Sequence, residues 1–147
     1  MRFFIFILLL FAPFLSNAQR SLGLSVNIRI ACGFVGETST EVSSIKRMVA
    51  SKSYDLLKKN LSQGNKIEAL LSAIALKELQ LKKLLELGAV DQQRITEIAN
   101  WQDDYTICYT CTQHFKGTVG ELLKNKHSFV YSLLSQTVVK ESFPAKE

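Results

Sequence analysis

The stretch SYDLLKKNLSQGNKIEALLSAIALKELQ, residues 53–80, decides the fold of this chain. Its apolar residues recur every three or four positions, which is the period of an amphipathic helix. The polar residues 62–65 interrupt this pattern, and Asn65 with Glu68 has the spacing of a capping box that starts a helix. The stretch therefore predicts two helices joined by a short turn, as in a mostly α fold.

The residues that follow continue the helical pattern. Gly88 is expected to end the second helix as a left-handed C-cap. A further helix is predicted from Asp91 to Phe115, because its apolar residues keep a spacing of three and four. These residues are Ile95, Ile98, Trp101, Tyr105, Cys108 and Phe115. A strand over residues 106–112 is the competing interpretation, since this segment is rich in threonine, isoleucine and tyrosine.

Capping-box spacing marks two more helix starts. Thr38 with Glu41 predicts a helix that carries the chain to the serine-rich residues 51–53. Thr118 with Glu121 predicts a final helix that extends to Val138. The expected architecture is thus an N-terminal strand followed by about five helices, arranged as a small bundle or as a stack of α-hairpins.

The N-terminal strand is predicted from a strict alternation of apolar and polar or small residues after Gln19. The apolar positions are Leu22, Leu24, Val26, Ile28, Ile30 and Cys32. A single strand leaves backbone groups unpaired, and three arrangements would satisfy them. The strand could pair with residues 106–112, lie flat across the helices beside water, or add to the sheet of a partner or second copy. In the last arrangement, residues 22–30 form a partner-binding strand.

Residues 1–18 have the pattern of a signal peptide. Arg2 precedes an apolar run over residues 3–15, and Ser16 and Ala18 are small residues at the positions that signal peptidase recognises. The run is short for a permanent membrane helix. We therefore expect cleavage after Ala18, a secreted or periplasmic protein, and no permanent membrane span.

The chain accordingly divides into four parts. The signal peptide covers residues 1–18, and an extended strand segment covers residues 19–36. The helical domain covers residues 37–140, and residues 141–147 are expected to form a flexible tail.

Residues 53–80 also resemble one HEAT-like helical repeat. A short helix leads through a turn with glycine and asparagine to a helix with small residues at Ala69, Ala73 and Ala75. HEAT-like repeats stack helical pairs into scaffolds and binding surfaces that have no catalytic activity of their own. The resemblance implies a protein-binding or scaffold role.

The three cysteines, Cys32, Cys108 and Cys111, are disulfide candidates, because an exported protein meets an oxidising compartment. A bridge from Cys32 to Cys108 or to Cys111 would join the strand to the helical domain. A direct bridge between Cys108 and Cys111 is the alternative.

Cys108, Cys111 and His114 also suggest a metal or thiol-redox site. Cysteine and histidine are zinc ligands, and His127 or Cys32 could complete the set. A redox pair would need its first cysteine at a helix N-terminus after a strand, and the predicted helix does not provide this.

The remaining residue patterns exclude several functions. The formal net charge of +5 is spread over scattered lysines and arginines, without the basic and aromatic clusters of a nucleic-acid surface. No nucleophile elbow, phosphate loop or dinucleotide motif is present, so we expect neither catalysis nor a cofactor. The sequence favours an exported, disulfide-stapled interaction module that binds another protein. The rival hypothesis is a small exported metal-binding or redox protein.

Overall fold

The computed structural model describes residues 25–32, 36–110 and 112–139. The predicted signal peptide, residues 19–24 and 33–35 of the predicted strand segment, and the predicted tail therefore lie outside the described residues. Within them the chain forms six helices and three strands. In chain order these are β1 (Val26–Arg29), α2 (Thr40–Ala50), α3 (Tyr54–Gln63), α4 (Lys66–Leu81), α5 (Ala89–Ile98), β2 (Asp104–Cys108), β3 (His114–Thr118), α6 (Val119–Lys124) and α7 (Phe129–Val138).

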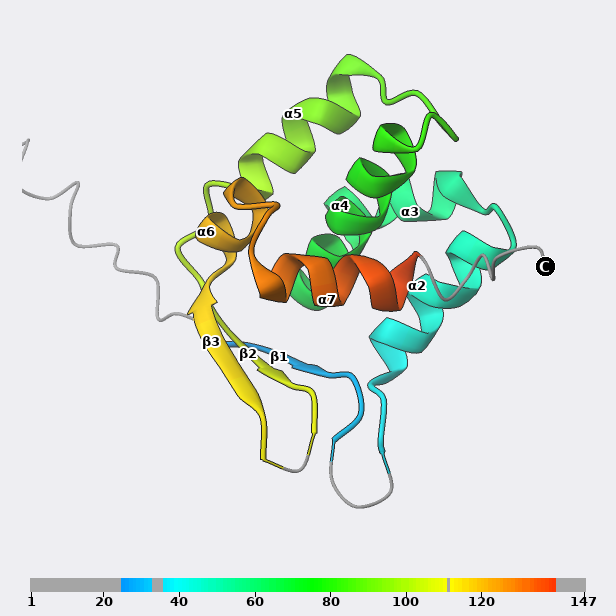
Figure 1. The fold of residues 1–147 in the computed structure, drawn as a ribbon. Coiled ribbons are helices and arrows are strands. Elements are labelled where there is room, and N and C mark those ends of the chain that lie inside the picture. Colours follow the sequence, from blue (N-terminus) through cyan, green and yellow to red (C-terminus); the bar gives the residue numbers. More distant parts are fainter. Residues whose placement is uncertain (1–24, 33–35, 111, 140–147) are drawn as a thin grey trace, which may run out of the picture.

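Helix α4 is the centre of the fold. Every residue from Ala69 to Leu76 is buried, and so is Leu79. A helix that is apolar on all sides needs neighbours all round, and α4 contacts α2, α3, α5, α7 and β1. Figure 1 shows these helices around α4, with the sheet at the lower end of the helical body. The prediction of a mostly α fold with an N-terminal strand is confirmed.

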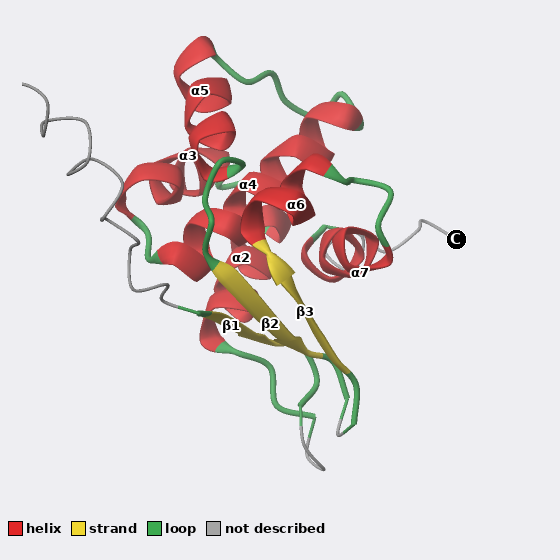
Figure 2. Ribbon diagram, turned by 90° about the vertical axis from the view of Figure 1, so that its left-hand side faces the viewer, coloured by secondary structure: helices red, strands yellow, loops and turns green. Residues whose placement is uncertain are grey.

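The three strands form one sheet in the order β1-β2-β3. β1 runs parallel to β2, and β2 runs antiparallel to β3. Val26 lies opposite Tyr105 and Ile28 opposite Ile107, and all four side chains are buried on the face that meets the helices. The other face is polar, as expected for a sheet covered on one side. Figure 2 shows the sheet in front of the helices, with β3 as one outer strand.

The predicted helix over residues 91–115 is wrong beyond Ile98. Residues 104–108 and 114–118 are strands. The helical spacing correctly places Tyr105 in the core. Ile107, two residues later, is buried too, and burial at every second residue is the period of a strand. Pairing with β1 settles the choice, so the strand interpretation holds over residues 106–108.

Several helix boundaries also differ from the predictions. The final helix is interrupted between Lys124 and Phe129, and Ser128 caps α7 by accepting a hydrogen bond from the Tyr131 backbone N–H. Helix α4 ends at Leu81 rather than at Gly88, and Gly88 is the N-cap residue of α5.

Other capping residues explain where the helices begin. Ser39, not Thr38, caps α2 by accepting from the Val42 N–H. The capping box of Asn65 with Glu68 is confirmed in full. Thr118 accepts from the Glu121 N–H at the start of α6, as its spacing predicts.

An ion pair joins the start of α4 to the segment before β2. Lys66 pairs with Asp103, whose side chain is largely buried, and the Lys66 ammonium lies 5.9 Å from the Trp101 ring centroid. The Asp103 carbonyl also accepts a hydrogen bond from the Val119 N–H, 2.9 Å away. These contacts fix the sheet on the helical body. None of the helices over the described ranges is long and apolar enough to cross a membrane.

Candidate functional site

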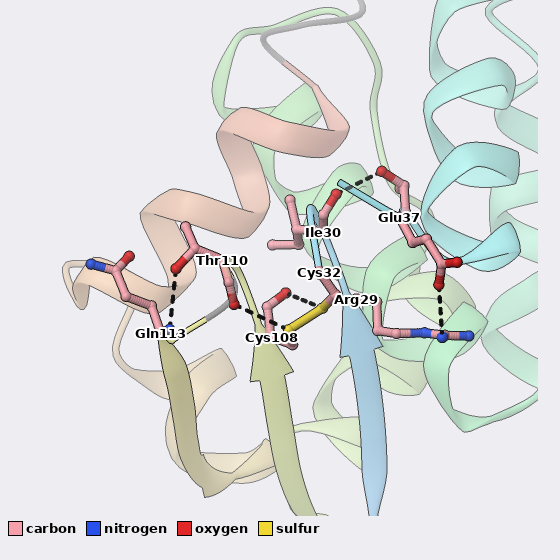
Figure 3. Close-up of a disulfide and its surroundings, with 8 residues drawn as sticks. Arg29, Ile30, Cys32, Glu37, Cys108, Thr110 and Gln113 are labelled. Atoms are coloured by element: carbon pink, nitrogen blue, oxygen red, sulfur yellow. Dashed lines mark hydrogen bonds and ion pairs between the residues drawn. A yellow bond between two sulfur atoms is a disulfide. The ribbon is translucent and has the colours of Figure 1, made fainter. Parts of the chain in front are cut away.

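A disulfide joins Cys32 to Cys108, with 5.7 Å between their Cα atoms (Figure 3). It connects the segment after β1 to the last residue of β2, which are separated by 76 positions in the chain. The predicted staple between the N-terminal strand and the main domain is thereby confirmed, with Cys108 as the partner. Cys111 lies outside the described residues.

The outer side of β1 is partly closed by the chain that follows it. Cys32 and Glu37 exchange two backbone hydrogen bonds of 2.9 and 2.8 Å, and the Ser39 N–H donates to the Arg29 carbonyl at 2.9 Å. On its inner side, the Ile30 N–H donates to the Cys108 carbonyl at 2.9 Å. β1 therefore has hydrogen-bond partners on both sides within its own chain.

The residues predicted to form a partner-binding strand lie mainly in the core. Val26, Ile28 and Ile30 are 2%, 1% and 8% exposed, so their side chains are not accessible to a partner. Leu22 and Leu24 lie outside the described residues. Of the three arrangements considered for this strand, the structure shows pairing with β2.

β3 forms the second edge of the sheet. The Tyr109 N–H donates to the Gln113 carbonyl at 3.0 Å, just beyond the paired residues of β2 and β3. Hydrogen-bonded and non-bonded residue pairs alternate along an antiparallel ladder, so this bond fixes which residues of β3 bond to β2. In this register Phe115 and Gly117 bond to β2, whereas the backbone groups of His114 and Lys116 point away from it. Within the described ranges, no strand lies beyond β3.

An exposed aromatic ring lies beside this edge. The centroids of the Phe115 and Phe129 rings are 5.4 Å apart, with a tilt of 55°. Phe115 is on the helix-facing side of β3 and is partly buried, whereas Phe129, the first residue of α7, is 64% exposed. We call the backbone of His114 and Lys116 together with Phe115 and Phe129 the β3 edge site.

The residues of the predicted metal or redox site are only partly brought together. His114 and Cys108 are opposite one another in the β2–β3 register, so their side chains share the solvent face of the sheet. The Cys108 sulfur is bonded to Cys32, however, and is not a free thiolate. His127 lies in the exposed segment between α6 and α7. Among the described residues, no three histidine, cysteine or acidic side chains form a group that could hold a metal ion.

Comparison with known proteins gives no family assignment. No protein-family model matches the sequence, and neither the curated proteins nor the solved structures searched contain a significant match.

The sequence patterns did not reveal the β3 edge site. His114 falls in the predicted helix over residues 91–115 and Lys116 directly follows it, and the strand is evident only from its pairing with β2. One usable signal was present: Ser128 is a good N-cap residue, and it predicts that Phe129 starts a new helix.

Proposed function

We propose that this protein is an exported, non-catalytic interaction module, and that the β3 edge site binds an extended segment of a partner protein. The observation that carries the proposal is the outward-pointing backbone of His114 and Lys116, which has no hydrogen-bond partner among the described residues. An added strand satisfies such groups with main-chain hydrogen bonds, and pockets for alternate side chains supply the specificity.

The position of Phe129 supports strand addition at this edge. A new strand would lie about 4.8 Å from β3, and every second side chain would point to the helix-facing side. Those side chains would lie over Phe129 next to Phe115, and its exposed ring would provide apolar contact area. The partner is therefore expected to carry apolar residues at alternate positions.

The side chain of Lys116 favours a different protein over a second copy as the partner. Lys116 and His114 are on the solvent face of the sheet. If two copies paired antiparallel about Lys116, the two lysines would lie opposite one another, and like charges in that position destabilise pairing. A carboxylate opposite Lys116 would be favourable instead.

Export is part of the same proposal, supported by the apolar run over residues 3–15 and the small residues before Gln19. The disulfide between Cys32 and Cys108 is in keeping with an oxidising compartment. The resemblance of residues 53–80 to a HEAT-like repeat also favours a binding role. Within the described residues, α3 and α4 pack closely as a helical hairpin.

The proposal is tested by replacing Lys116 with proline or with alanine. The Lys116 N–H points away from β2, so proline removes an outward donor without breaking the ladder, as on natural edge strands. A photo-reactive amino acid in place of Phe129 would capture the partner in the native exported fraction. We expect Lys116→Pro to reduce capture about tenfold or more, and Lys116→Ala to reduce it much less.

Two results would count against the proposal. One is equal capture by the proline and alanine variants. The other is capture of only a second copy of the same chain, which would make the edge a dimer contact. A photo-reactive residue at the distant exposed position Val90 serves as the control and should not yield the same adduct.

A further inference from the structure

A groove between α4, α5 and α6 has no role in the strand-addition site. Its volume is about 550 Å³, and Lys77 and Lys124 are the charged residues that line it. Its other lining residues are either amides and a hydroxyl, which could donate hydrogen bonds, or apolar. They are Gln80, Leu87, Gln92, Ile95, Thr96, Ala99, Asn100 and Leu123.

Lys77 is held in place at the groove. Its Nζ donates to the Leu123 carbonyl at 2.9 Å and lies 5.9 Å from the Tyr131 ring centroid. Burial, together with the nearby Lys126 charge, lowers the pKa of Lys77, and Glu78 only partly opposes this effect. A partly desolvated ammonium gains more from a carboxylate partner than an exposed one does.

The groove is lined by hydrogen-bonding and apolar side chains, and its lining carries an excess of positive charge. No aspartate or glutamate lines it. A cleft lined by one sign of charge focuses the field and attracts groups of the opposite sign. The side-chain amides of Gln80 and Asn100 have no hydrogen-bond partner among the described residues, so they are available to a ligand.

Lys124 links this groove to the surface near the β3 edge site. It also lines a neighbouring depression, together with Tyr105, Glu121 and Ser128, and Ser128 directly precedes Phe129.

We infer that this groove binds an acidic, partly apolar peptide segment of the partner, with a carboxylate on Lys77 and a second one near Lys124. The inference rests on the proposed function, because it names the chemistry of the partner that the module binds. Apolar side chains of the segment would contact Leu87 and Ile95 on the groove wall.

The test uses purified protein and a defined peptide, an N-acetylated hexapeptide of alternating leucine and glutamate. Binding is followed by NMR, and the amide signals that shift identify the site. We expect saturable shifts at residues that line the groove, no binding by the matching leucine–glutamine peptide, and weaker binding at high salt.

Three variants locate the contact. Lys77→Met keeps the apolar stem and should weaken binding about three- to tenfold, and Lys124→Met should weaken it about twofold. Lys59→Met, which alters an exposed lysine outside the groove, is the matched control and should leave binding unchanged. Lys124 is exposed, so its variant remains informative if Lys77→Met lowers the melting temperature.

The outcomes separate this inference from the proposed function. Equal binding by all three variants, or equal displacement of the peptide by free phosphate at the same concentration, would overturn the groove assignment. Capture that depends on Lys116 but not on Lys77 or Lys124 would leave the strand-addition site standing and reject the groove. If peptide binding depends on Lys77 but capture of the partner is unchanged by Lys116→Pro, the groove is supported and the β3 edge site is rejected.

Discussion

At the scale of single residues, the cysteines carry the clearest consequence of the structure. The bridge between Cys32 and Cys108 closes a long loop, since 76 positions separate the two residues. In the chain-entropy model, a bridge of this span stabilises the fold by restricting the unfolded chain. Cys111 has no part in this bridge.

Replacing Cys32 with serine should lower the free energy of unfolding by about 2–4 kcal/mol under oxidising conditions. In reductant, the variant and the natural protein should melt nearly together, because neither then has the bridge. Cys111→Ser is the control for connectivity and should melt like the natural protein. Thermal or urea unfolding measures all three, and a loss of stability in Cys111→Ser that equals the loss in Cys32→Ser would contradict the assigned pairing.

Tyr131 gives a second prediction at this scale. Its ring is buried, and its hydroxyl has no hydrogen-bond partner among the described residues. Burial and the nearby Glu78 carboxylate raise the pKa of Tyr131 above its ordinary value of 10.0. The folded state thus favours the protonated phenol, and this contribution to stability is fully present below pH 10 and is lost as the pH rises above it.

Tyr131→Phe should therefore change stability by less than about 1 kcal/mol at pH 7, because no hydrogen bond is lost. Above pH 10 its free energy of unfolding should fall less steeply with pH than that of the natural protein. Urea unfolding at several alkaline pH values gives both slopes. Parallel slopes would mean that the phenol ionises as readily in the folded protein as in the unfolded chain.

At the scale of the elements, two helices end in the same unusual way. Lys52 after α2 and Lys83 after α4 both have a positive φ, of 56° and 58°. In each case the next residue donates back into the last helical turn, from Ser53 to Met48 and from Leu84 to Leu79, both at 2.9 Å. This is the Schellman arrangement, which glycine occupies most easily.

Lys52→Gly should stabilise the protein by about 0.5 kcal/mol, because glycine adopts a positive φ without the steric cost that lysine meets. Lys52→Ala, which retains that cost, is the matched control. The difference in unfolding midpoint between the two variants isolates the backbone effect. A glycine variant no more stable than the alanine variant would show that Lys52 is not strained.

The elements also show what local sequence can and cannot predict. The capping box at Asn65 depends on residues within one turn, so spacing alone identified it. The helix ends at Lys52 and Lys83 have no glycine, so the sequence does not indicate a left-handed residue at these positions. β2 depends on pairing with β1, more than 70 residues away in the chain, and β3 depends on pairing with β2. The helical spacing of Tyr105 and Cys108 fits equally well until that pairing is known.

At the scale of the whole molecule, the helical body built on α4 supports a small sheet whose two edges, within the described residues, are a partly closed β1 and an open β3. The segment through Glu37 and Ser39 bonds to Cys32 and to Arg29 at the end of β1, and the disulfide joins Cys32 to β2. β3 is left with outward backbone groups beside Phe129. The strand-addition hypothesis drawn from the sequence concerned residues 22–30, and we propose β3 as its site instead.

Amide hydrogen exchange at β3 tests this central claim most directly, first in the protein alone and then in complex with the captured partner. In the free protein the His114 and Lys116 amides should exchange quickly, whereas Phe115 and Gly117, bonded to β2, should be protected. In the complex, we predict that the His114 and Lys116 amides become protected by at least about tenfold. Unchanged exchange at both amides in the complex would contradict the account.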